Sequence, residues 1–60
     1  MPYTYKNKRG EVWYLHVKIG RGGNLIFYFS KDPIDALDSI PPGYIVVEAR
    51  NGVPMLKKMG

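Results

Sequence analysis

The chain has 60 residues, enough for one thin domain that buries only roughly 60% of its unfolded surface. It has no cysteine and one histidine, which excludes disulfides and thiolate metal sites and leaves no zinc ligand set. Nine Lys and Arg against five Asp and Glu give a net charge of +4, which favours a polyanionic partner; a solvated surface without such a partner is the alternative.

The charge is unevenly distributed along the chain. Residues 1–31 carry a net charge of +5, residues 32–49 carry −4 and residues 50–60 carry +3. Two basic ends therefore flank an acidic middle, and this arrangement favours an oriented electrostatic face.

The N-terminal residues 1–9 are predicted to be a flexible basic extension, although "PYTYK" alternatively adds an edge strand. They lack the apolar stretch of a signal peptide. No apolar run approaches the roughly 20 residues that a membrane span needs. We therefore expect a cytoplasmic protein with no membrane partner.

Residues 11–19 alternate in polarity and are predicted to form a strand. The glycine-rich segment 20–24 reverses the chain into a second strand, 25–30. Pairing of Ile19 with Leu25 places odd-numbered residues on one face and even-numbered residues on the other. The predicted core is the odd-numbered face: Trp13, Leu15, Val17, Ile19, Leu25, Phe27 and Phe29. The opposite face holds Tyr14, His16, Lys18, Ile26 and Tyr28, with His16 near Tyr28.

A short helix is predicted over about residues 33–39, because Asp32 is a good N-cap and Pro33 suits the first helical position. The Pro-Pro-Gly sequence at 41–43 ends it. Asp35, one of the acidic residues of this segment, faces solvent or assists the helix N-terminus.

Strands are predicted over 44–49 and 53–58, joined by the Asn-Gly hairpin signal at 51–52. Pro54 cannot donate a hydrogen bond to a sheet, so the last strand should lie at an edge. The fold class is α+β and mostly β: one small antiparallel sheet of three to four strands with one short helix. Residues 1–60 form a single small domain.

No residue set nominates a reaction, and we expect no enzyme, catalytic residue, cofactor, metal or small-molecule substrate. A nucleophile, a base and an orienting group are not grouped in the sequence. His16 on a sheet face is more typical of packing or a phosphate contact than of a general base. Asp35 and Asp38 resemble a carboxylate pair, but a hard metal ion needs more oxygen ligands.

The segment "GRGG" at 20–23 differs from a phosphate-binding loop, because it leads into a strand and lacks Lys-Ser or Lys-Thr. It is predicted to be a hairpin turn that displays Arg21, either as turn geometry alone or as a phosphate contact.

The even-numbered face of the hairpin is the better candidate for nucleic-acid binding, because Tyr14, His16 and Tyr28 combine rings with the cation of Lys18. The alternative is that the helix or the chain ends cover this face. The basic segments 5–9 and 56–58 are a separate signal for phosphate contacts.

The segments "WYLHVK", "GGNLIFYFSKDP" and "ALDSIPPGYIVVEARNGVPMLKK" resemble a family of very short prokaryotic proteins of largely unknown function. The resemblance runs from Trp13 to Lys58, and residues 1–10 lie outside it. Archaeal members look like small accessory proteins of the large ribosomal subunit, and no catalytic motif comes with the family. The shared pattern covers Tyr14, Leu15, His16, Tyr28, Phe29, Ser30, Lys31, Gly43, Tyr44, Gly52, Pro54, Leu56, Lys57 and Lys58.

The sequence and the resemblance together predict a structural RNA-binding protein of the archaeal large (50S) ribosomal subunit. Its partners would be ribosomal RNA and neighbouring ribosomal proteins. The predicted RNA-binding residues are Lys6, Lys8, Arg9, Tyr14, His16, Lys18, Arg21, Tyr28, Lys31, Arg50, Lys57 and Lys58. Two alternatives are a free protein-binding module, which would use Asp32, Asp35, Asp38 and a hydrophobic edge, and a nonribosomal single-stranded nucleic-acid binder.

Overall fold

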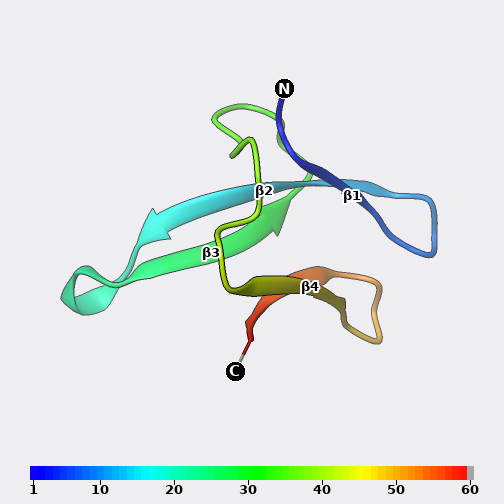
Figure 1. The fold of residues 1–60 in the computed structure, drawn as a ribbon. Coiled ribbons are helices and arrows are strands. Elements are labelled where there is room, and N and C mark those ends of the chain that lie inside the picture. Colours follow the sequence, from blue (N-terminus) through cyan, green and yellow to red (C-terminus); the bar gives the residue numbers. More distant parts are fainter. Residues whose placement is uncertain (60) are drawn as a thin grey trace.

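The computed structural model describes residues 1–59 and contains two small antiparallel sheets (Figure 1). The first sheet has the order β1-β2-β3 and the second pairs β4 with β5. The strands are β1 (Thr4–Lys6), β2 (Val12–Ile19), β3 (Leu25–Ser30), β4 (Tyr44–Glu48) and β5 (Pro54–Lys58). The mostly β character is confirmed, but the single sheet that we predicted is instead divided into two.

The register of the β2–β3 hairpin is the predicted one: Ile19 pairs with Leu25, and His16 pairs with Tyr28. Of the two alternatives for the N-terminus, the structure has the edge strand, because β1 pairs antiparallel with β2. Residues 4–6, which we had placed in a flexible extension, are therefore tied into the first sheet.

The core lies between the two sheets, on the odd-numbered face of β2 and β3. Leu15 is fully buried and Phe29 is nearly so. The rings of Tyr3 and Tyr5 lie against Phe29, with centroids 6.5 and 6.3 Å away. Phe27 contacts Tyr44 of the second sheet at 5.4 Å. The apolar face that β2 and β3 form by alternation is thus buried where β4 and β5 pack on it.

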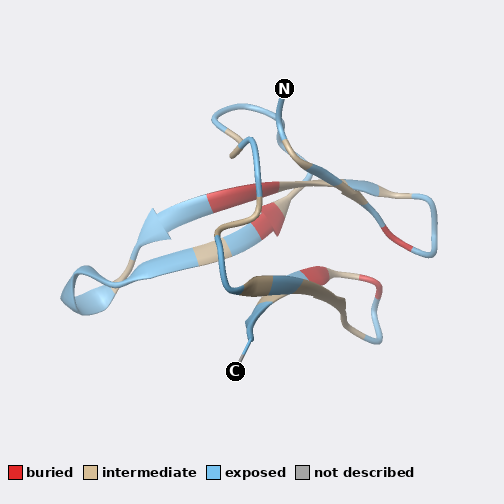
Figure 2. Ribbon diagram, viewed as in Figure 1, coloured by how far each residue is buried: buried red, intermediate tan, exposed pale blue. Residues whose placement is uncertain are grey.

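The outer half of the same apolar face is not covered, which corrects part of the predicted core. Ile19 is 75% exposed and Leu25 is 63% exposed, and Val17 is exposed as well (Figure 2). The β2–β3 hairpin is longer than the small second sheet that packs on it, so its distal end projects beyond the core.

The predicted helix over 33–39 is wrong, and this segment is a loop with one turn. The capping hydrogen bond does form, since the Ile34 N–H donates to Asp32 Oδ1 at 2.9 Å. Asp35 then adopts a positive φ of 60°, which ends any helical path. The Leu37 N–H donates to the Leu15 carbonyl of β2 at 2.8 Å. A segment this short is a marginal helix, and the long-range hydrogen bond replaces the helical one.

The hairpin loops 7–11 and 49–53 have the same geometry. In each, the first residue donates its N–H to the carbonyl of the last, and the glycine at the fourth position donates to the carbonyl of the first. Gly10 and Gly52 have positive φ angles of 82° and 86°, as the bulge after a type I turn requires. Loop 20–24 repeats these hydrogen bonds around the short 3-10 turn η1 (Arg21–Gly23).

Candidate nucleic-acid interface

The even-numbered face of the β2–β3 hairpin is covered at one end by the loop that follows β3. His16 is buried, and its Nε2 lies 2.7 Å from the Asp32 carbonyl oxygen. Because a carbonyl can only accept, the ring N–H at Nε2 must donate. Tyr14, which lies two residues before His16 on the same face of β2, is half-buried. A loop, rather than a helix, therefore closes this part of the candidate face.

The other end of that face is open. The predicted proximity of His16 and Tyr28 is confirmed, since their rings stack with centroids 5.3 Å apart and an interplanar angle of 18°. Lys18 Nζ lies 5.5 Å from the centroid of the Tyr28 ring. Tyr28 is 40% exposed, but one ring face already packs on His16. The open part is therefore Lys18, Ile26 and the remainder of Tyr28, which is smaller than a row of stacking rings.

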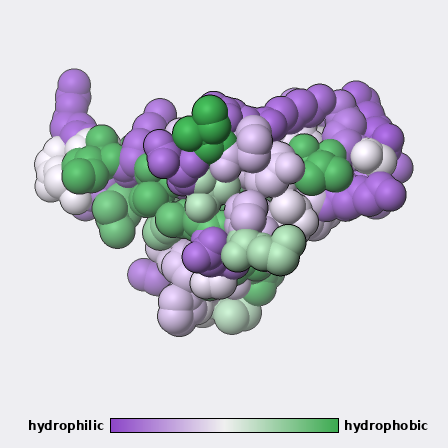
Figure 3. All heavy atoms as spheres, turned by 90° about the horizontal axis from the view of Figure 1, so that it is seen from above, coloured by the Kyte–Doolittle hydropathy of each residue, from purple (hydrophilic) through white to green (hydrophobic). Residues whose placement is uncertain are grey.

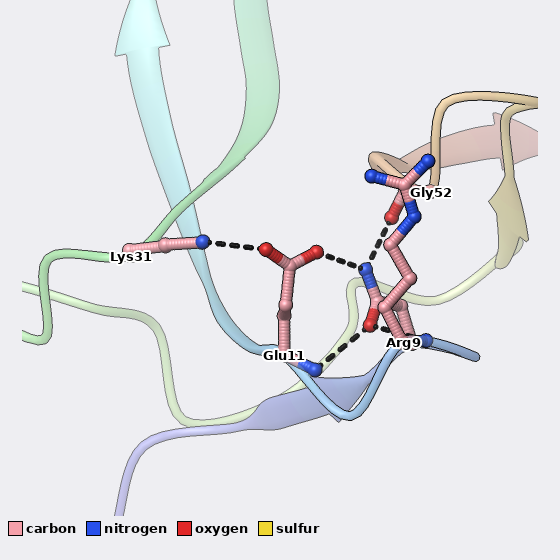
Figure 4. A network of polar contacts seen from close by, with 5 residues as sticks. Arg9, Glu11, Lys31 and Gly52 are labelled. Atoms are coloured by element: carbon pink, nitrogen blue, oxygen red, sulfur yellow. Dashed lines mark hydrogen bonds and ion pairs between the residues drawn. The ribbon is translucent and has the colours of Figure 1, made fainter.

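Lys31 takes part in an internal ion pair. Its Nζ lies 2.8 Å from Glu11 Oε2 (Figure 4). The same Nζ lies 5.2 Å from the centroid of the Trp13 ring. The hydrogen bond from Lys31, with a second from Asn7, lowers the pKa of Glu11 below its ordinary value. This lysine is exposed and charged, but its nearest anion belongs to the chain itself.

Asn7 joins the two loops 7–11 and 49–53, which we call the loop pair. Its side chain is buried, and Nδ2 donates to the Gly52 carbonyl at 2.7 Å and to Glu11 Oε1 at 2.9 Å (Figure 4). Its Oδ1 accepts from the backbone N–H groups of Arg9 and Glu11, at 3.0 and 2.8 Å. One amide thus fixes its own turn and attaches it to the turn of the other sheet.

Glu48 forms a second joint between the sheets. Its Oε1 accepts a hydrogen bond from the Tyr5 hydroxyl at 3.0 Å and another from the Lys8 backbone N–H at 3.3 Å. The hydrogen bond to this carboxylate, with some burial and its negative charge, raises the pKa of Tyr5. The carboxylate is therefore directed into the joint between β1 and β4.

Besides Lys18 on β2 and Lys31 after β3, the predicted cations lie in three places. One basic group lies at the loop pair, Arg21 lies at the opposite end of the molecule on η1, and two lysines lie on β5 (Figure 1). All are exposed. The group at the loop pair is Lys6, Lys8, Arg9 and Arg50; the group on β5 is Lys57 and Lys58. The cations of the first group lie in separate segments of the sequence, and the structure brings them to one end.

The residues that build the loop pair were missed by the sequence analysis. Asn7, Tyr5 and Glu48 act through contacts between residues 40 or more positions apart in sequence, so no local pattern signals them. The available signal was the spacing of Asn7 and Gly10, in which Asn is followed by Gly at the fourth turn position. That spacing marks the turn but not its partner.

Among residues 1–59 there is no pocket and no group of three side chains that could hold a metal ion. In the same residues, no helix is both long and apolar enough to cross a membrane. The exposed features of this part of the chain are charged loops and an apolar hairpin end. No protein-family model, curated protein or solved structure matches the chain.

Proposed function

We propose that the chain is a structural RNA-binding protein of the archaeal large ribosomal subunit. The observation that carries the proposal is the different placement of cations and carboxylates. The cations of the loop pair, of η1 and of β5 are exposed, whereas Glu11 and Glu48 are engaged by donors of the chain itself. Such a surface attracts the RNA backbone, whose phosphates dominate affinity.

The remaining carboxylates lie apart from these cations in sequence. Asp32, Asp35 and Asp38 are all exposed on the loop between β3 and β4. Asp38 lies 3.8 Å from the N-terminal ammonium group. The acidic loop would orient the protein on RNA, because the RNA phosphates would attract the exposed cations and repel this loop.

The ribosomal part of the proposal rests on the resemblance of residues 13–58 to the archaeal accessory proteins. The size of the core supports a role within a larger assembly. Leu15 is the one large side chain among residues 1–59 with less than 2% exposure. A chain with so small a core gains stability from any partner that binds only the folded state.

Sedimentation of cell extract through sucrose gradients at low and high salt tests this proposal. We expect the protein to migrate with the large subunit at low salt and to leave it as salt rises, because phosphate contacts are screened. A protein that stays at the top of the low-salt gradient would contradict the proposal.

A protein-binding module is the second candidate, and the apolar end of the β2–β3 hairpin favours it. Ile19 and Leu25 are paired on one face of the hairpin and are mostly exposed there. Apolar patches of this kind mark contact sites. This candidate predicts that affinity purification after nuclease treatment recovers one defined protein with weak salt dependence, and that Leu25→Asp abolishes its recovery.

A further inference from the structure

We propose that the loop pair, residues 7–11 and 49–53, is one preformed binding site for backbone phosphates of RNA, with Asn7 as its positioning residue. The inference rests on the proposed RNA-binding function and names the part of the surface that would carry it. The class of ligand is a phosphodiester chain. A free nucleotide is disfavoured because small ligands bind in concave pockets, and residues 1–59 form none.

The first step is that the two loops are held together by buried contacts. Asn7 is 5% exposed, yet it lies in a surface turn. Its Nδ2 reaches the Gly52 carbonyl of the other loop, while its Oδ1 holds the backbone of Arg9. The position of Arg9 is thereby linked to the loop that carries Arg50.

The second step is the close approach of Arg9 to Gly52. A Cβ atom on Gly52 would lie 3.5 Å from both Cδ and Nε of Arg9, and 3.3 Å from Asn7 Nδ2. The Arg9 side chain therefore extends over the backbone of loop 49–53, two residues from Arg50. The residue in between, Asn51, holds its own loop by accepting a hydrogen bond from the Val53 N–H.

The third step is that the nearby carboxylates accept hydrogen bonds from donors of the chain itself, whereas the side chains of the cations of the loop pair form no ion pair in the described residues. Glu48 accepts from Tyr5 and from the backbone of Lys8, and Glu11 accepts from Asn7 and Lys31. Within residues 1–59 the side chains of Lys8, Arg9 and Arg50 make no ion pair with a carboxylate. In Figure 3 the end that carries the loop pair is mainly hydrophilic, whereas hydrophobic residues gather toward the opposite end.

The chemistry follows from these three steps. Two guanidinium groups on one fixed frame can each donate paired hydrogen bonds to a phosphate. Because the frame is formed before binding, less side-chain and loop order is lost on association. The loop pair should therefore bind RNA more tightly than an equal number of cations elsewhere on the surface.

The test measures binding of the whole chain to a labelled RNA stem-loop by fluorescence anisotropy over a series of salt concentrations. Arg9→Gln with Arg50→Gln is compared with Lys57→Gln with Lys58→Gln, since each pair removes two cations. We expect the arginine pair to lower affinity by about tenfold or more and the salt slope by nearly two. The lysine pair should have a clearly smaller effect.

A second comparison changes no charge. Asn7→Ala should lower affinity by about threefold to tenfold, because freed loops must be ordered on binding. Asn24→Ala, the matched change in the third hairpin loop, should bind like the wild type. Circular dichroism establishes that each variant is folded, and if Asn7→Ala is not, the comparison of the arginine and lysine pairs decides alone.

Equal losses for the two cation pairs would overturn the loop-pair site while leaving RNA binding intact. Wild-type affinity in a folded Asn7→Ala variant would overturn the positioning role. Absence of any binding by the wild-type chain at low salt would overturn the proposed function, and the inference with it.

Discussion

The two ends of the molecule contain the same kind of turn in different surroundings. At the loop pair, two turns are joined by the buried Asn7 and by Glu48. At the distal end of the β2–β3 hairpin, residues 17–26, the same hydrogen bonds close loop 20–24, but no second element covers it. There the side-chain bond from Asn24 Nδ2 to the Arg21 carbonyl stays within the loop, at 3.3 Å.

The geometry of a turn and its attachment to the rest of the fold therefore have separate causes. The glycine at the fourth position of each loop permits the bulge, whatever surrounds it. The tertiary contacts then decide whether the loop is part of a rigid frame. One end therefore displays cations on two joined loops, and the other exposes Ile19 and Leu25 to solvent.

The largest expected difference between the ends concerns two leucines on the same face of the same hairpin. Leu15→Ala should lower the free energy of unfolding by about 3 kcal/mol, because it leaves a cavity in a small core. Leu25→Ala, at the exposed end, should change it by less than about 0.5 kcal/mol. Urea denaturation measures both. Similar losses would mean that the distal end is packed in solution.

The next difference concerns the asparagines of the two ends. Asn7→Ala should cost about 2 kcal/mol, because it leaves the Gly52 carbonyl and the Arg9 and Glu11 N–H groups without their partner. Asn24→Ala removes a long, exposed hydrogen bond and should cost less than about 0.5 kcal/mol. If the two variants unfold at the same urea concentration, the joint between the loops contributes no stability.

A smaller difference separates two glycines with nearly equal backbone angles. Gly23 and Gly52 have φ angles of 80° and 86°, so Gly→Ala strains the backbone equally at both. An added Cβ meets nothing within 4 Å at Gly23, but at Gly52 it would lie only 3.3 Å from Asn7 Nδ2, which must shift, and would be in ordinary contact with Arg9. We expect Gly52→Ala to be the less stable by about 1 kcal/mol in thermal unfolding. Equal stability would show that the loops separate freely.

The smallest effect concerns the acid side of the stability profile. The pKa of Glu11 is lowered below 4.5 by the hydrogen bonds from Lys31 and Asn7, so the folded state binds the proton less readily than the unfolded state. The stabilisation is present above pH 4.5 and is lost as pH falls through the folded-state pKa. Glu11→Gln should therefore lower the thermal midpoint near neutral pH, with the difference from wild type vanishing in acid.

The control for this profile is Asp35→Asn, which removes an exposed carboxylate of the acidic loop and keeps a residue that tolerates positive φ. It should retain the wild-type dependence on acid. A wild-type profile for Glu11→Gln as well would show that the ion pair with Lys31 does not form in solution.

Local sequence patterns were sufficient to predict strands β2 to β5 and the register of the β2–β3 hairpin, whereas β1 was only an alternative to a flexible extension. Alternating polarity and glycine spacing are local properties, and a hairpin needs little else. This is why the pairing of Ile19 with Leu25 and the closeness of His16 to Tyr28 could be predicted. The exposed cations of the loops and of β5 could be predicted in the same way, because turn residues and chain ends lie at the surface.

The way in which the hairpins and loops combine depends on tertiary contacts. Asp32 does form the hydrogen bond of a helix cap, yet the bond from Leu37 to Leu15 of β2 makes the segment a loop that covers His16. Likewise, the joint of Asn7 with Gly52 spans 45 residues and gathers cations that are far apart in the chain. Such contacts depend on which surfaces meet after the hairpins have formed, and local sequence patterns do not predict which surfaces these are.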